Sequence, residues 1–115
     1  MKVTIFHNPR CSKSRATLAL LRARGIEPEI IEYLATPPDA ATLRRLFKAL
    51  GAKPRELLRA NEDAFRKLRL DRAQVTDAEI IDAMVRHPVL MERPIVVTGA
   101  RAVIGRPPER VLEIL

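Results

Sequence analysis

The chain has 115 residues, enough for one compact domain with its own hydrophobic core and too few for a second. Its 47% hydrophobic and 30% charged residues are typical of a folded globular protein and argue against intrinsic disorder. The formal net charge of +7 suggests an anionic partner, but only 3% of residues are aromatic and the arginines are dispersed among acids, which argues against nucleic acid. We therefore expect a largely solvated basic surface, with a few arginines for a small, multiply charged anion.

No segment approaches the ~20 apolar residues of a membrane span, and the N-terminus lacks the pattern of a signal peptide. The single cysteine, Cys11, cannot form an internal disulfide, which fits a protein of the reducing cytoplasm. For a chain of this size we expect a monomer. Any redox cycle through Cys11 must take its second thiol from another molecule.

The first third of the chain predicts a strand, a helix and a second strand. Val3–Phe6 is an apolar, β-prone run that ends at a turn, and Ser12–Arg24 follows as a helix. Gly25 is placed to be the left-handed residue after that helix, and Glu29–Tyr33 is the second strand. The apolar stripe of the helix includes Ala16, Leu18 and Leu21. This order predicts a βαβ unit with parallel strands.

The middle of the chain predicts helices. Thr36 is expected to cap the first one, with Pro37 at its first helical position and Gly51 at its end. Its apolar positions repeat at helical spacing in Leu43, Leu46, Phe47 and Leu50.

Two shorter helical pieces are expected over Arg55–Ala60 and Glu62–Leu68. Thr76 and Glu79 have the spacing of a capping box and open another helix, which ends at His87. We interpret His87 as a structural residue at a helix end.

The last part returns to strands. Ile95–Thr98 and Ala102–Ile104 predict a hairpin, and Pro107 and Pro108 start a final helix. The whole order is βαβ, a helical insertion over about residues 36–90, then ββα. We therefore predict an α/β fold: a single thioredoxin-like domain over residues 1–115, a sandwich with a mixed sheet and a helical insertion between its two halves.

Cys11 lies where the first predicted strand gives way to the first helix. Unpaired N–H groups and the positive end of the dipole at a helix N-terminus favour a thiolate, and Arg10, Lys13 and Arg15 add positive charge. A lone cysteine is more often a small buried apolar residue. With the turn, the basic flank and the helix start together, we predict that Cys11 is a reactive nucleophile.

Four motifs in order make the chain resemble the glutaredoxin-coupled arsenate reductase family, a branch of the thioredoxin-fold proteins that includes Spx-type transcription regulators. The motifs are His7-Asn8-Pro9-x-Cys11-x-x-Ser14-Arg15, Leu57-Leu58-Arg59-x-Asn61, Arg93-Pro94-Ile95-Val96-Val97 and Gly105-Arg106-Pro107. The resemblance extends essentially from end to end.

The resemblance implies that Cys11 attacks arsenate while Arg59, Arg93 and Arg106 hold the oxyanion. Guanidinium groups suit this role because they make permanently charged, bidentate contacts to tetrahedral oxyanions. Glutathione would then add as the second thiol and glutaredoxin would accept the glutathionyl group. The resemblance also implies that Pro94 is a cis-proline beside the cysteine.

Three other motif residues are expected to have supporting roles in the site. His7 would supply positive character or a hydrogen bond to the thiolate, although it could also be a strand-end histidine that faces solvent. Asn8 and Ser14 would donate hydrogen bonds that fix the loop and the sulfur, or act only as local caps. No histidines or carboxylates have metal-ligand spacing, so we expect no metal and no bound cofactor, with glutathione as co-substrate.

Rival classes fit less well. A phosphatase-like enzyme would need an arginine at position 17, where the chain has Thr17, and a conventional thioredoxin would need a second cysteine at Ser14. Two alternatives stay open: a monothiol glutathione-dependent oxidoreductase without arsenate specificity, and an Spx-like regulator that binds RNA polymerase. Arg10 and Lys13 could either stabilise the thiolate or crowd the anion pocket.

Overall fold

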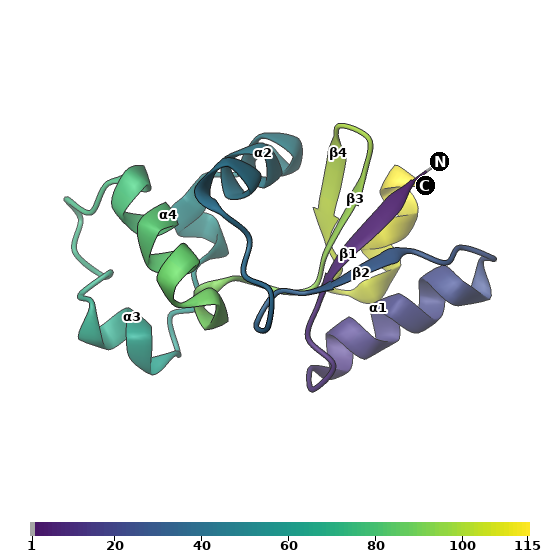
Figure 1. Cartoon of the computed structure of the whole chain (residues 1–115), viewed down its shortest axis with the longest axis horizontal. Coiled ribbons are helices and arrows are strands. Elements are labelled where there is room, and N and C mark those ends of the chain that lie inside the picture. Colours follow the sequence, from purple (N-terminus) through teal and green to yellow (C-terminus); the bar gives the residue numbers. More distant parts are fainter. Residues whose placement is uncertain (1) are drawn as a thin grey trace. The chain divides into compact units, whose positions relative to one another are not determined.

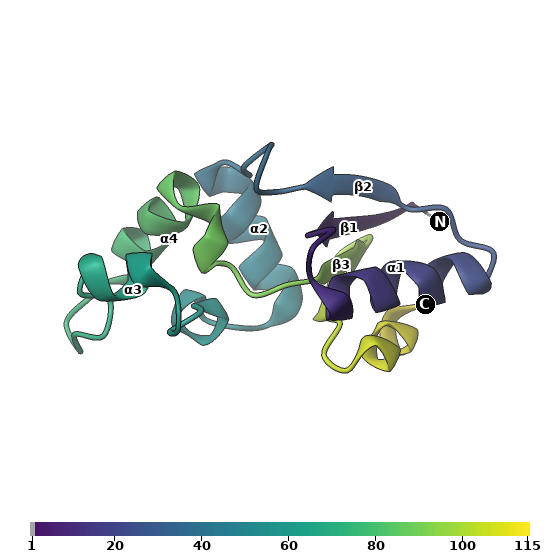
Figure 2. The same ribbon diagram turned by 90° about the horizontal axis from the view of Figure 1, so that it is seen from below.

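The structure is a computed structural model that describes residues 2–115. Its elements divide into two compact units (Figures 1 and 2). The sheet unit contains residues up to Thr36 together with Arg93–Leu115, and the helical unit contains Pro37–Glu92.

Four strands form one mixed sheet in the order β2-β1-β3-β4. Their bounds are β1 Val3–His7, β2 Glu29–Glu32, β3 Ile95–Thr98 and β4 Arg101–Ile104. β1 and β2 are parallel, whereas β1 with β3 and β3 with β4 are antiparallel. The thioredoxin-like α/β fold expected from the sequence is confirmed. β3 has its expected bounds, and each of the other strands differs from its expected bounds by one residue at one end.

Helix α1 (Ser12–Ala23) and the 3-10 helix η3 (Pro108–Ile114) cover one face of this sheet (Figure 2). The core cluster beneath them consists of Val3, Ile5, Leu21, Val96, Val103, Val111 and Ile114.

The final helix, η3, is a 3-10 helix and not the predicted α-helix. Pro107 is its N-cap residue and Pro108 its first residue, and neither has an N–H group. The Arg110 N–H donates to Pro107 O at 3.0 Å, which is the i to i+3 pattern.

The buried face of α1 differs from the predicted apolar stripe. Ser14, Thr17 and Leu21 are buried on it, whereas Ala16 is exposed. The prediction failed because it assumed that only apolar residues point inward. Gly25 follows the helix with φ 76°, as expected for a left-handed residue.

In the helical unit, α2 spans Ala40–Leu50 and is capped by Asp39, not by Thr36 as predicted. The Asp39 carboxylate accepts a hydrogen bond from Thr42 N at 2.8 Å. Thr36 precedes one proline and Pro37 precedes another, and a residue before proline is disfavoured in the helical conformation, so the helix starts later. Gly51 ends it with φ 65°, as predicted.

The rest of the unit consists of short helices: η1 (Pro54–Leu57), α3 (Asp63–Lys67), α4 (Asp77–Arg86) and η2 (Pro88–Leu90). The predicted helical piece over Arg55–Ala60 is only the 3-10 helix η1. The capping box is confirmed, since Thr76 Oγ1 accepts from Glu79 N and Glu79 Oε1 accepts from Thr76 N, both at 3.1 Å.

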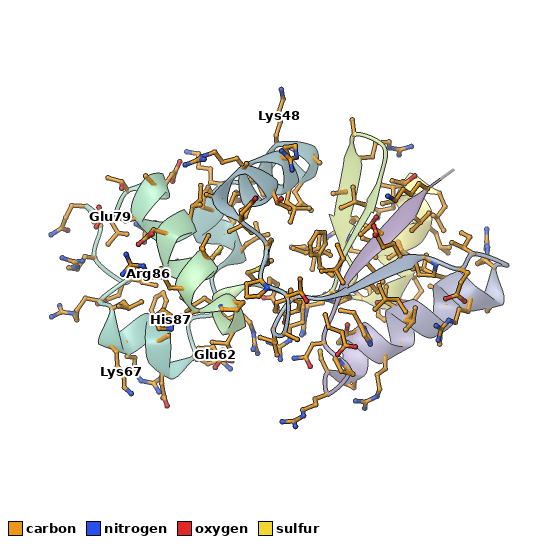
Figure 3. The ribbon with its side chains drawn as sticks, in the orientation of Figure 1. Lys48, Glu62, Lys67, Glu79, Arg86 and His87 are labelled. Carbon is orange, nitrogen blue, oxygen red and sulfur yellow. The ribbon has the colours of Figure 1, made fainter. Side chains whose placement is uncertain are left out.

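Charged side chains cover the outside of this unit. Lys48, Lys67, Glu79 and Arg86 are exposed on its helices, and His87 is exposed at the end of α4 (Figure 3). These groups belong to the solvated surface that the composition suggested. No helix within residues 2–115 is long and apolar enough to cross a membrane.

Gly105 allows α1 to approach the segment after β4. A Cβ atom built on it would lie 2.6 Å from Thr17 Oγ1 and 3.0 Å from Pro94 Cγ. Gly105 N also donates to Pro94 O at 3.0 Å. The absence of a side chain at Gly105 therefore lets three segments meet: α1, the residue before β3 and the residues after β4.

We predict that Gly105→Ala destabilises the protein by about 1–3 kcal/mol, the usual range for overpacking. The cost should fall in a Thr17→Ala background, because that change removes the nearest atoms. Urea unfolding of the wild type, both single variants and the double variant measures the coupling. An equal cost of Gly105→Ala in both backgrounds would contradict this packing.

Candidate active site

Cys11 is the N-cap residue of α1, with extended backbone angles of φ −93° and ψ 123°. Its N–H donates to Asn8 O, and its carbonyl accepts from Arg15 N, each at 3.0 Å. The residue is only 8% exposed. The turn between strand and helix therefore places Cys11 where the sequence predicts it, next to the first turn of N–H groups that lack partners within a helix.

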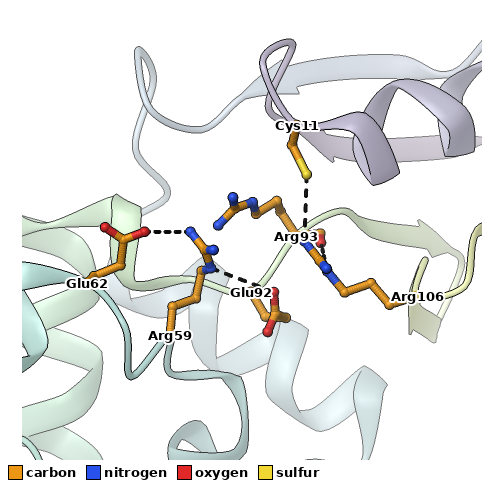
Figure 4. Close-up of polar contacts among 6 residues, drawn as sticks. All are labelled: Cys11, Arg59, Glu62, Glu92, Arg93 and Arg106. Atoms are coloured by element: carbon orange, nitrogen blue, oxygen red, sulfur yellow. Dashed lines mark hydrogen bonds and ion pairs between the residues drawn. The ribbon is translucent and has the colours of Figure 1, made fainter.

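Arg106 contacts the sulfur. Its Nη2 donates to Cys11 Sγ at 3.6 Å, and its Nε donates to Arg93 O at 2.7 Å (Figure 4). A buried structural cysteine would have apolar neighbours, whereas this one has a permanently charged guanidinium beside its sulfur. The structure thus brings together Cys11, Arg106 and the Arg93 backbone, which lie far apart in the sequence.

Arg93 and Arg106 each precede a cis peptide bond, to Pro94 and Pro107 respectively. The resemblance implied the first of these, and the second was not expected. Arg106 N also donates to Ile104 O at 2.9 Å, so the backbone of this segment is held at the end of β4.

His7, Ser14 and Asn8 form a hydrogen-bonded group behind the loop. His7 Nδ1 lies 2.6 Å from Ser14 Oγ, and the Asn8 N–H donates to the same oxygen at 3.0 Å. His7 is 6% exposed and Ser14 is fully buried. His7 is therefore not the strand-end histidine facing solvent that was one expectation.

Burial lowers the pKa of His7, since charging a desolvated imidazole is unfavourable. The nearby Glu32 carboxylate raises this pKa, while Arg22 and Arg15 lower it, with a net downward effect. At pH 7 the neutral imidazole predominates, so hydrogen bonding, and not positive charge, is what His7 can offer the loop.

The basic residues around the cysteine mostly face solvent. Arg10 and Lys13 are exposed, and the Arg10 N–H donates to Asn8 Oδ1 at 3.0 Å. Arg15 Nη1 donates to Pro9 O at 3.0 Å. Hydrogen bonds made by Asn8 and Arg15 thus hold the loop, while Arg10 and Lys13 are exposed to solvent.

Arg59 belongs to the helical unit. Leu58 and Met91 form an isolated antiparallel bridge, flanked by bonds from Arg59 N to Leu90 O and from Glu92 N to Leu57 O, both at 2.9 Å. This short ladder places the Arg59 side chain beside Glu92, which directly precedes Arg93 in the chain.

Two carboxylates pair with Arg59 (Figure 4). Its Nη1 donates to Glu62 Oε1 at 2.6 Å, and its Nε lies 3.9 Å from Glu92 Oε1. Sequence reasoning missed both acids. The i, i+3 spacing of Arg59 and Glu62 was a signal for the first pair. No pattern among neighbouring residues indicates Glu92, because it is brought beside Arg59 by the bridge between Leu58 and Met91.

Within residues 2–115, no group of three or more histidine, cysteine, aspartate or glutamate residues could hold a metal ion. An open groove of about 690 Å³ runs along α1. It is lined by His7, Pro9, Arg15, Leu18, Ala19, Arg22 and Ala23.

The chain is similar to known proteins over its whole length. The chain is 47% identical over 116 residues to an arsenate reductase of Haemophilus influenzae, with 100% of both chains covered. It is 56% identical over 115 residues to the protein of Escherichia coli (strain K12) named "Uncharacterized protein YfgD", covering 99% of this chain and 97% of that one.

Among solved structures, one described as an arsenate reductase from Vibrio cholerae matches with a TM-score of 0.97 and 50% identity. The match covers 100% of this chain and 98% of that one. Residues 6–114 match the ArsC family. The chain therefore belongs to the ArsC family.

Proposed function

We propose that this protein is an arsenate reductase that uses the Cys11 thiolate as its nucleophile and takes electrons from glutathione through glutaredoxin. The observation that carries the proposal is the contact of Arg106 Nη2 with Cys11 Sγ at 3.6 Å. A guanidinium there stabilises a thiolate and also binds the oxyanion that the thiolate attacks. The arsenate reductases at 44–47% identity support the same substrate.

The first step joins sulfur to arsenic. The Cys11 thiolate attacks arsenic(V), and one arsenate oxygen leaves as water after protonation. Arg106, Arg93 and Arg59 stabilise the remaining oxygens, with Arg59 assigned by its place in the Leu57-Leu58-Arg59 motif. N–H groups of the first turn of α1 add to the anion site.

The next steps need two thiols from outside, because Cys11 is the only cysteine in the chain. Glutathione displaces a second arsenate oxygen as water, so that arsenic carries both sulfurs. The glutaredoxin thiolate then attacks the glutathione sulfur and forms a mixed disulfide. The electron pair of the broken bond reduces arsenic to the trivalent state, and hydrolysis releases arsenite and the Cys11 thiol.

Further assignments complete the proposal. We propose that the protein acts as a monomer in the cytoplasm, where glutathione is available and Cys11 stays reduced. His7 and Ser14 position the loop through their hydrogen bond. An Spx-like regulator would need no guanidinium at the sulfur, so the Arg106 contact favours an enzyme.

The proposal predicts arsenate-dependent NADPH consumption in a coupled assay with glutathione, glutaredoxin and glutathione reductase. Cys11→Ser should abolish turnover, because the nucleophile is lost. Arg106→Ala should lower it by roughly 10²–10³, the usual cost of losing one contact that stabilises charge in the transition state. Arg110→Ala, which removes an exposed arginine that pairs with Glu113, is the matched control and should retain activity.

Omission of glutaredoxin should stop the steady-state reaction, which tests the electron donor separately from the substrate. No turnover by the wild type, with Cys11 still reactive toward a thiol reagent, would overturn the arsenate assignment. Reduction of glutathionylated proteins in the same assay would then favour the monothiol oxidoreductase.

His7 gives a prediction for stability against pH. Its pKa in the folded protein lies below the ordinary value of 6.5, so the unfolded chain binds the proton first. The contribution of neutral His7 to the free energy of unfolding is fully present above pH 6.5. It is lost as the pH falls through the pKa of His7 in the folded protein. Urea unfolding between pH 7.5 and 5 should therefore show a steeper loss for the wild type than for His7→Gln.

The matched control is His87→Gln, which removes the exposed histidine at the end of α4 and leaves His7 in place. Equal slopes for the wild type and His7→Gln would show that His7 is not held in its neutral form.

A further inference from the structure

Two carboxylates, those of Glu62 and Glu92, lie beside the Arg59 guanidinium. Its side chain is 15% exposed, and the carboxylates of Glu62 and Glu92 that face it are 25% and 28% exposed. The bond from Nη1 to Glu62 Oε1 is 2.6 Å long, whereas Nε is 3.9 Å from Glu92 Oε1. Glu62 is therefore the main partner and Glu92 the secondary one.

The pairing is built into the backbone of the helical unit. Glu62 is the N-cap residue of α3, and its N–H donates to Arg59 O at 3.2 Å, so the two residues face each other across one turn. The ladder around Leu58 and Met91 fixes Glu92 on the other side. Arg59 is thus oriented from two directions and stays in place if the charge of one partner is removed.

A carboxylate bonded to an arginine opposes the binding of an oxyanion to that arginine. It occupies one of the guanidinium donors, and it repels a second negative charge that approaches. An oxyanion that takes Arg59 as a ligand must therefore displace the Glu62 carboxylate or bind beside it. Either way, binding becomes weaker than it would be at an arginine with no acidic neighbour.

We propose that Glu62 lowers the affinity of the site for oxyanions by competing with them for Arg59. This inference rests on the proposed function, in which Arg59 binds the substrate. Sulfate and phosphate form no bond to Cys11, so their affinities report the effect of Glu62 on oxyanion binding alone.

The test compares Glu62→Gln with Asp63→Asn. Gln keeps the shape of Glu and an oxygen that accepts from Arg59, while it removes the charge. Asp63→Asn removes the same charge one residue further on, where the partner is the exposed Arg66. Each variant is titrated calorimetrically with sulfate and with phosphate at low ionic strength, without reductants.

We expect Glu62→Gln to bind both anions about five-fold more tightly, as for the loss of one partly exposed ion pair. Asp63→Asn should stay within about two-fold of the wild type. In the coupled assay, phosphate should inhibit Glu62→Gln at correspondingly lower concentrations.

Unchanged or weaker anion binding by a folded Glu62→Gln variant would overturn the inference, because Glu62 would then only position Arg59. If the wild type still reduces arsenate in that case, the proposed function stands without it. Equal tightening in Glu62→Gln and Asp63→Asn would also overturn it, since net charge alone would explain the change.

Discussion

The contact between Arg106 and the Cys11 sulfur is the interaction on which the proposed chemistry depends. It joins a residue at the start of α1 to a residue after β4, and both positions are set by the sheet unit. Gly105 directly precedes Arg106, and a Cβ atom at Gly105 would lie 2.6 Å from Thr17 Oγ1 and 3.0 Å from Pro94 Cγ. The segment that carries Arg106 is therefore closely packed against α1 and Pro94.

Two of the motif arginines have different surroundings, which suggests different tasks. Arg106 contacts a sulfur and the carbonyl of Arg93, so its charge acts on the nucleophile. Arg59 contacts the carboxylates of Glu62 and Glu92, so its charge is partly compensated. We propose that Arg106 activates the sulfur and that the acidic partners of Arg59 set how strongly anions are held.

Features governed by neighbouring residues could be predicted from the sequence. The start of α1 at Ser12, the left-handed Gly25 and the capping box at Thr76 follow from short patterns and are confirmed. The cap at Thr36 was wrong because two prolines delay the helix, and Asp39 accepts the first-turn hydrogen bond instead. Contacts between distant segments, such as that of Glu92 with Arg59, have no local signal. The family resemblance identified the arginines, whereas only the structure showed which residues they contact.

The alkylation rate of Cys11 by iodoacetamide tests the central claim most directly. It is measured at pH 7 and low ionic strength for the wild type, Arg106→Leu and the control Arg110→Leu. If Arg106 holds the sulfur as a thiolate, Arg106→Leu should react about ten-fold more slowly, since the thiolate is the reactive form. Arg110→Leu should react like the wild type. Equal rates for wild type and Arg106→Leu would show that the contact does not activate Cys11.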